Sequence, residues 1–426
     1  MRGGFVRLAL SSGAAMAPTL AGAQAIGAGT SIVIDPSLDR NDVAGARIEP
    51  AFQPHPILIG PVFVQPGVSV VGGYDSNVFN RPDAKGAGLA TIMPSLSLRT
   101  NLPRHELTLS AAGTVRRFSR YRSENSEEFA GEATGRLDFG ERNTVRASAG
   151  YSHLIEPRSS AGSVPDAAEP VSYGLFAAEL GTGLAFGGLH LAPGLRYERA
   201  RYDAVALAGG GKADQSFRDT RKLRGEARLD YDLSGFVSAF AAAAYEDLKS
   251  TAAPADARRD AKSQSVAVGL HGALSPVLSG EVRVGYQWRD YAVPSYRDFQ
   301  GLTFRGDLQW YVTPLLTLRA RASRTFRNSG NRQVGAILAD AFTLSAYYDP
   351  LRNLRLSADA TLERGDFGDV DTRTWRKSVR LRGQYRVNGA LSFGGYLGFV
   401  RQDVSGLPLV NAFTAFSAGL GVTVTS

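Results

Sequence analysis

The chain has 426 residues, of which 43% are hydrophobic and 21% are charged, with 48 Gly and no Cys. This balance excludes a wholly disordered chain, and no run of about 18 apolar residues marks a transmembrane helix. The lack of Cys excludes disulfide frameworks, thiolate metal sites and Cys nucleophiles. The formal net charge of +8 comes mainly from Arg residues scattered singly along the chain, which argues against a nucleic-acid partner.

The first residues have the pattern of a secretory signal peptide. Arg2 and Arg7 give a positively charged start, a stretch of small and apolar residues follows, and Ala23-Gln24-Ala25 is an A-x-A cleavage site. We therefore expect residues 1–25 to be removed by cleavage near Ala25. An exported chain without Cys suits a Gram-negative envelope, where folding does not depend on oxidation.

Residues 26–66 differ in composition from everything after them. They contain six Pro and show little periodicity. We expect an irregular periplasmic segment that serves as a tether or as a partial plug.

From Gly67 onwards, apolar and polar residues alternate. In residues 302–310, for example, apolar or small residues occupy every even position and polar residues every odd position. A period of two is typical of a β-strand with one apolar and one polar face.

The connections between these segments alternate in length. Short connections rich in turn residues are expected at 101–104, 140–143, 187–188, 232–235, 275–276, 313–314, 349–350 and 388–389. Longer connections are expected at 77–86, 119–126, 155–170, 203–215, 250–261, 292–298, 328–333, 366–373 and 403–410. Together they divide residues 67–426 into about 18 strands, which is typical of a transmembrane β-barrel.

A soluble β-sandwich or propeller is the alternative for alternating strands. The segments here are longer than the strands of about 5–6 residues that are usual in soluble sheets. Their polar face, which includes Arg319 and Arg321, is also too charged to form a core. The sequence therefore predicts an all-β fold, a transmembrane antiparallel barrel over residues 67–426. Both termini and the short turns are expected in the periplasm, and the long loops outside the cell.

Several short motifs resemble one known family. They are Gly60-x-x-Phe63 with Pro66, Tyr74-Asp75-x-Asn77-Val78, Pro94-Ser95, His105-x-Leu107, Glu156-Pro157-Arg158, Glu169-Pro170, Gly285-Tyr286, Arg289-Asp290-Tyr291 and Gly301-Leu302 with Phe304. In order and spacing, residues 60–426 resemble the Putative beta-barrel porin 2 family. The resemblance implies an outer-membrane barrel of a kind often associated with exopolysaccharide production. It implies no catalytic residues, because the family has none that are agreed.

The resemblance also implies partners. The outer-membrane barrel assembly machinery usually reads a terminal aromatic residue, whereas residues 421–426 contain none, so the assembly signal is expected to be atypical. Outer-membrane lipid and lipopolysaccharide are expected around the wall. Periplasmic polysaccharide export proteins are the partners expected for an export channel.

We find no pattern of catalytic or metal-binding residues. The five His residues are far apart in sequence, and no hydrolase, metalloprotease or phosphate-loop motif is present. We expect neither an enzyme nor a cofactor or metal site, although a barrel hydrolase with a lipid-facing Ser/His pair is an alternative.

The polar face of the strands supplies candidate pore-lining residues. These are Arg283, Arg305, Asp307, Arg319, Arg321, Arg355, Arg380, Arg382 and Arg386. Arg outnumbers the acids, and arginines along a wide lumen favour anions, although the same residues could simply pair across strands and hold the wall.

We therefore expect an outer-membrane channel with a basic lumen, through which an acidic exopolysaccharide is exported. One alternative is a general or anion-preferring diffusion porin. Another is a structural or adhesin-like barrel with a blocked lumen.

Overall fold

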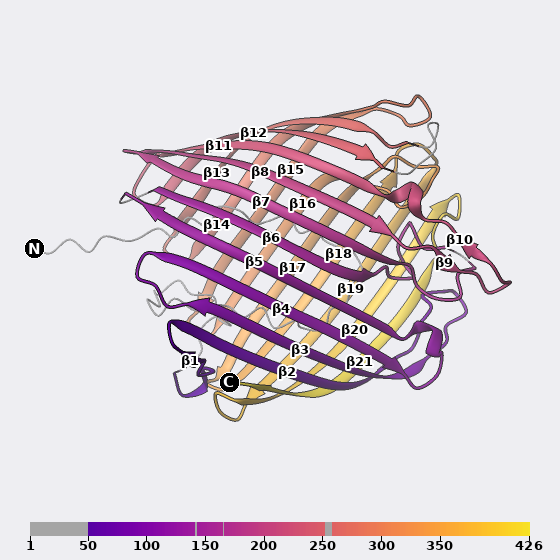
Figure 1. The fold of residues 1–426 in the computed structure, drawn as a ribbon, viewed down its shortest axis with the longest axis horizontal. Coiled ribbons are helices and arrows are strands. Elements are labelled where there is room, and N and C mark those ends of the chain that lie inside the picture. Colours follow the sequence, from indigo (N-terminus) through magenta and orange to yellow (C-terminus); the bar gives the residue numbers. More distant parts are fainter. Residues whose placement is uncertain (1–49, 141–142, 165, 252–257) are drawn as a thin grey trace, which may run out of the picture.

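The computed structural model describes residues 50–140, 143–164, 166–251 and 258–426. The predicted signal peptide and residues 26–49 lie outside the described residues. Within the described part, eighteen long strands form one closed antiparallel barrel, which confirms the predicted fold class (Figure 1). No helix in these ranges is long and apolar enough to span a membrane.

The wall follows chain order around the barrel. Its strands are β2 (Val62–Asp75), β3 (Ala87–Thr100), β4 (His105–Phe118), β5 (Ser126–Phe139), β6 (Asn143–Ile155), β7 (Ser172–Phe186), β8 (Leu189–Tyr202), β11 (Thr220–Asp232), β12 (Val237–Ser250), β13 (Ala261–Ser275), β14 (Leu278–Tyr291), β15 (Phe299–Thr313), β16 (Leu316–Asn328), β17 (Ala336–Leu351), β18 (Leu354–Phe367), β19 (Thr372–Arg386), β20 (Leu391–Gly406) and β21 (Phe413–Thr425). The smaller elements are η1 (Pro50–Phe52), β1 (Ile57–Ile59), η2 (Arg122–Glu124), β9 (Val205–Ala206), β10 (Lys212–Ala213) and η3 (Ser216–Arg218).

Pairing between the first and the last wall strand closes the barrel. The register of β2 and β21 runs from Gly67 opposite Thr425 to Asp75 opposite Ser417. Every wall strand therefore has two hydrogen-bonded neighbours. A wall without open edges leaves few backbone groups unpaired in a surrounding apolar phase.

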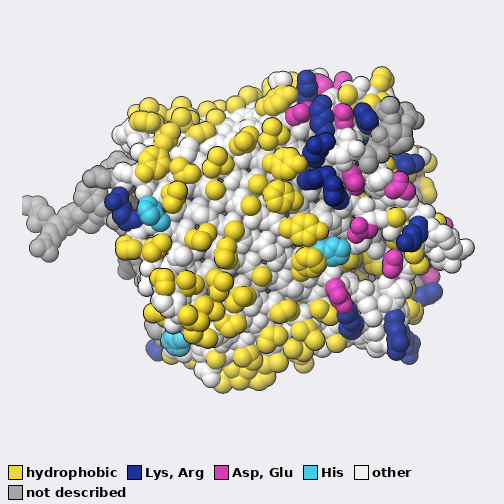
Figure 2. Space-filling view, in the orientation of Figure 1, with side chains coloured by type: hydrophobic (Ala, Val, Ile, Leu, Met, Phe, Trp, Pro, Cys, Tyr) yellow, Lys and Arg dark blue, Asp and Glu magenta, His cyan; other side chains and the backbone are white. Residues whose placement is uncertain are grey.

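The period-two pattern of the sequence becomes an apolar outside and a polar inside. Val268 and Leu302 are 64% and 62% exposed, although they are apolar. Figure 2 shows such side chains as a broad band across the visible face of the barrel, with most charged side chains near the loop end. Exposed apolar residues in such numbers are expected only where lipid replaces water as the solvent.

The predicted alternation of short and long connections is confirmed, since the short turns lie at one end of the barrel and the long loops at the other (Figure 1). One predicted turn, at residues 349–350, is misplaced. There β17 continues to Leu351 through a bulge between Tyr348 and Leu351, and β18 begins at Leu354. Pro350 interrupts the ladder without ending the strand, because a bulge tolerates a residue that lacks an N–H group.

The segment expected to be irregular up to residue 66 is partly regular. The first wall strand begins at Val62, and β1 pairs with its first three residues. This pairing has a simple cause: β21 ends at Thr425, opposite Gly67, so the earlier part of β2 needs another partner. The carbonyl oxygen of Gln53 also lies 2.2 Å from where a Cβ on Gly389 would be, which places this segment against the β19–β20 turn.

The alternation predicts which face tolerates a charge at mid-wall. Leu344 is exposed on the apolar face and pairs with Ala360 in the register of β17 and β18. Thr361 follows Ala360 and therefore lies on the polar face at nearly the same depth. We expect Leu344→Arg to lower the free energy of unfolding by about 2–4 kcal/mol in a refolding titration into lipid vesicles. Thr361→Arg is the control at the same depth. It should cost much less, because Asp359 and Glu363 flank it on the same face. Equal losses in both variants would contradict this assignment of faces.

Candidate functional site

The nine candidate pore residues gather on one part of the wall. They lie on β14, β15, β16, β18 and β19, on the face opposite the exposed apolar side chains. That face is the inside of the barrel, because Arg228 of β11 reaches Glu281 of β14 across the two strands between them, at 2.8 Å. The alternation of β-strands thus brings together arginines that are up to a hundred residues apart in sequence.

Some of these arginines form ion pairs with an acidic residue. Arg319 donates to Asp307 at 2.7 Å, as a diagonal pair between β15 and β16. Arg382 donates to Asp359 at 3.0 Å. Arg355 lies 3.4 Å from Asp349 at the short-turn end. These pairs support the interpretation that part of the arginine set holds the wall together.

The other candidate arginines have no such partner. Among the described residues, no acidic oxygen lies within the 4.0 Å salt-bridge distance of Arg283, Arg305, Arg321, Arg380 or Arg386. Arg283 and Arg305 even face each other directly in the register of β14 and β15. Two like charges in such a position need water or an incoming anion to stabilise them. This part of the wall, which we call the basic wall, therefore carries an excess of positive charge.

The opposite part of the lumen wall is closer to neutral. Arg196 of β8 contacts both Glu179 and Glu198, at 3.0 and 2.7 Å. Glu198 also accepts a contact from Lys222 on β11. The lumen arginines without an acidic partner that are named above thus lie on the basic wall, whereas the charges of β7, β8 and β11 described here are paired.

Long loops fold over the outer end of the barrel. We call residues 156–164, 203–219, 258–260 and 329–335 the outer cap. Its centre is Arg218, which donates two hydrogen bonds to Glu156, at 2.6 and 2.8 Å, and one to the carbonyl oxygen of Gly162. The side chains of Arg218 and Glu156 are 3% and 10% exposed, so this ion pair is almost fully buried.

A second buried ion pair anchors the same loop. Arg158 contacts Glu124 at 2.5 and 3.0 Å and also donates to the carbonyl oxygen of Ala167. Burial alone would lower the pKa of Arg218, but hydrogen bonding to Glu156 and its charge outweigh burial and raise that pKa. The Arg218 guanidinium therefore stays charged although it is buried.

The cap reaches from one side of the mouth to the other. A Cβ added to Gly330 would lie 2.5 Å from the Cα of Gly162, although the loops that hold them follow β16 and β6, on nearly opposite sides of the barrel. Arg259 donates to the carbonyl oxygens of Ser329 and Asn331. Arg332 lies 4.4 Å from the ring centre of Phe217. These contacts tie loops from several parts of the wall into one unit over the outer opening.

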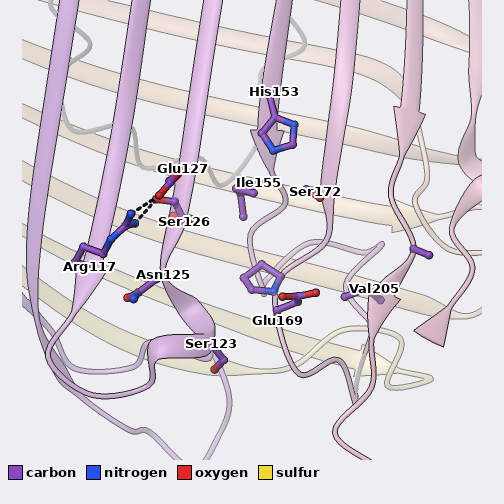
Figure 3. A pocket seen from close by; sticks show the side chains of 12 residues that line it. Arg117, Ser123, Asn125, Ser126, Glu127, His153, Ile155, Glu169, Ser172 and Val205 are labelled. Atoms are coloured by element: carbon purple, nitrogen blue, oxygen red, sulfur yellow. Dashed lines mark hydrogen bonds and ion pairs between the residues drawn. The ribbon is translucent and has the colours of Figure 1, made fainter. Parts of the chain in front are cut away.

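A separate pocket of about 480 Å³ lies at the outer rim, between β4 and the β8–β9 connection (Figure 3). Its labelled residues include His153 and the ion pair of Arg117 with Glu127. These side chains share the face of the exposed Phe129 and Tyr151, so the pocket opens away from the lumen. Within the described residues, no group of three or more His, Asp or Glu side chains could hold a metal ion.

The profile of the Putative beta-barrel porin 2 family matches residues 49–425. The chain belongs to this family. Membership and the closed barrel together establish a porin-like channel of the outer membrane. The resemblance expected from the sequence motifs is thereby confirmed.

Several solved outer-membrane barrels are similar to this porin-family chain at low identity. Pseudomonas aeruginosa OpdK, solved with vanillate, is 11% identical, with 85% of this chain and 99% of that chain covered and a TM-score of 0.46. A mutant of the ferric enterobactin receptor PfeA from the same organism is 10% identical, with coverages of 85% and 80% and a TM-score of 0.45. The siderophore receptor PiuA from Acinetobacter baumannii is 11% identical, with coverages of 87% and 82% and a TM-score of 0.46. No curated protein sequence matches the chain.

Sequence reasoning did not find the outer cap of this porin-family barrel. Arg158 and Glu156 were noticed only as parts of a family motif, and Arg218 and Arg259 carried no distinguishing pattern. One feature of the sequence does point to the cap. The Glu-Pro-Arg sequence places opposite charges in a long connection outside the strands, where they need partners from other loops. Its partners could not be identified, because Arg218 is 62 positions from Glu156.

The buried ion pair predicts how the cap can be loosened. Glu156→Gln leaves the Arg218 guanidinium buried without a countercharge, which costs about 3–5 kcal/mol for a pair of this kind. We expect faster protease cleavage in residues 156–171 and a larger open probability in planar bilayers.

Glu127→Gln is the matched control. It removes the same charge from an ion pair in which Glu127 is 69% exposed, and it should change neither measurement. A cap that remained equally resistant in Glu156→Gln would show that this pair does not hold it in place.

Proposed function

We propose that this porin-family barrel is an anion-preferring outer-membrane channel and that its permeation path follows the basic wall. The observation that carries the proposal is the set of five lumen arginines without an acidic partner among the described residues, Arg283, Arg305, Arg321, Arg380 and Arg386. A porin that needed charge only for stability would gain more from pairing them, as it does with Arg319 and Asp307.

The arrangement of these arginines suits transfer from one site to the next. Arg283, Arg305 and Arg321 lie on the adjacent strands β14, β15 and β16. Arg380 and Arg386 lie on β19, with Arg386 nearer the short-turn end. An anion can exchange one guanidinium for another along this path, provided that each contact is weak enough to release it.

The cargo that we propose is an acidic exopolysaccharide moving outwards, delivered at the short-turn mouth by periplasmic polysaccharide export proteins. The spacing of the basic wall supports this choice, because a chain with repeated carboxylates could contact several arginines at once. A polymer could leave only when the outer cap moves aside. Small anions are the alternative cargo, since they need a smaller opening.

Ion selectivity tests the channel proposal. At low salt we expect anion preference in planar bilayers, and a clear loss of it when Arg283, Arg305 and Arg321 are all changed to Gln. The preference should fade at high salt, because charges are screened over about 8–10 Å at physiological ionic strength and over shorter distances above it.

The matched control changes three outward-facing arginines, Arg324, Arg373 and Arg401, to Gln. It removes the same charge from outside the lumen and should leave selectivity unchanged. A cation-selective wild type would overturn the proposal. A wild type that stays closed, and that Glu156→Gln does not open, would favour a barrel with a blocked lumen.

Polysaccharide secretion tests the cargo separately. In cells that secrete an acidic and a neutral polysaccharide, the triple lumen variant should reduce export of the acidic polymer only. Equal secretion of both polymers by wild type and variant would contradict the polysaccharide cargo, while an altered bilayer selectivity would still support an anion channel.

A further inference from the structure

A second group of cations, of which only Lys249 has an acidic partner among the described residues, lies on the outside of the barrel. Arg199 of β8, Arg221 of β11 and Lys249 of β12 are direct neighbours in the strand register. Arg201 follows two residues after Arg199, on the same face of β8. We call these four residues the outer basic cluster. Figure 2 shows a row of Lys and Arg side chains at the loop-side border of the apolar band.

The outer basic cluster faces away from the lumen. Arg221 lies on the same face of β11 as the exposed Leu223 and Leu229, and Lys249 lies on the same face of β12 as the exposed Tyr245. The register partner of Arg199 on β7 is Phe176, which is also exposed. These cations therefore point into the zone around the barrel and not into its interior.

Two outward cations elsewhere on the wall are paired with acids. Arg324 lies 2.6 Å from Asp340, and Arg401 lies 2.9 Å from Asp403. By contrast, within the ranges that the structure describes, Arg199, Arg201 and Arg221 have no acidic oxygen within the 4.0 Å salt-bridge distance.

Two acidic residues, Asp247 and Asp219, lie near the outer basic cluster and offset only part of its positive charge. Lys249 contacts Asp247 at 3.5 Å. The carboxylate of Asp219 accepts a hydrogen bond from the backbone N–H of Tyr202, at 2.7 Å, and interacts electrostatically with Arg201 and Arg199 without forming an ion pair with either. The Nε atom of Arg199 is buried and makes no hydrogen bond. Three adjacent cations with so little internal compensation need an anion from outside.

The level of the cluster identifies the kind of anion. One step nearer the middle of the barrel, the same face carries Tyr197 and Leu223, and Leu223 is 47% exposed. The ring of Tyr197 lies 6.2 Å from that of Phe176. An aromatic and apolar surface directly beneath cations is typical of the border between acyl chains and headgroups. Because the long loops lie on this side, the adjacent lipid layer is the outer leaflet.

We propose that the outer basic cluster binds the phosphate groups of lipid A, the membrane anchor of lipopolysaccharide. The cluster spans three neighbouring strands and so about 10 Å, which suits a headgroup with two phosphates better than one with a single phosphate. Guanidinium groups bind phosphate through paired hydrogen bonds, and the acyl chains would lie on the apolar face below. This site rests on the outer-membrane location and not on transport through the lumen.

Lipid binding to the purified barrel tests this site. Native mass spectrometry in detergent would compare bisphosphorylated lipid A, dephosphorylated lipid A, phosphatidylglycerol and inorganic pyrophosphate as added probes. We expect bisphosphorylated lipid A to bind about tenfold or more tightly than the dephosphorylated form, because charged hydrogen bonds are lost. Changing Arg199, Arg201 and Arg221 together to Gln should abolish that difference, and changing them to Lys should keep part of it.

The control is again the variant with Arg324, Arg373 and Arg401 changed to Gln, which removes three outward charges that already have acidic partners. It should bind lipid A as the wild type does. A heat-modifiable gel shift in every variant would show that each one is folded. The proposal would be overturned if the wild type bound bisphosphorylated and dephosphorylated lipid A equally well. It would also be overturned if phosphatidylglycerol or pyrophosphate bound as tightly as lipid A, or if the Gln variant bound lipid A as the wild type does.

Discussion

The constraint on which the whole structure depends is that the wall must satisfy its own backbone hydrogen bonds, since hydrocarbon offers none. The β2–β21 pairing meets it by closing the sheet, and β1 covers the short stretch of β2 that β21 does not reach. Once the sheet is closed, side chains can only point outwards or inwards. Period two in the sequence therefore becomes an assignment of every wall residue to lipid or lumen.

This assignment gives two populations of arginine different physical tasks. Outside the barrel, a charge away from water needs an acid, as Arg324 has in Asp340, or a headgroup. Inside, water is present, so a cation such as Arg305 can remain unpaired at a tolerable cost. The proposed channel and the proposed lipid site use the same excess of Arg over acid on opposite faces of one sheet.

The strands and turns were predictable because they depend on local patterns: alternation within about a dozen residues and turn residues between them. The exception at Pro350 shows the limit of such reasoning, since a bulge needs a partner strand that the local sequence does not reveal. For the lumen, alternation places Arg319 and Asp307 on one face, but only the side-chain contacts show that these two residues pair, while Arg283 and Arg305 have no acidic partner among the described residues. The outer cap depends entirely on such distant contacts, as between Gly162 and Gly330.

The chemistry of the cap also bears on how the channel could open. A buried ion pair such as Arg218–Glu156 adds little net stability compared with apolar packing, but exposing only one partner is very unfavourable. The cap is therefore expected to be held closed or displaced as a unit, because partial opening would leave buried charges without partners. The two ion pairs that anchor the cap, Arg218–Glu156 and Arg158–Glu124, are each neutral overall. In the proposed channel, selection by charge and control of access would therefore depend on different residues.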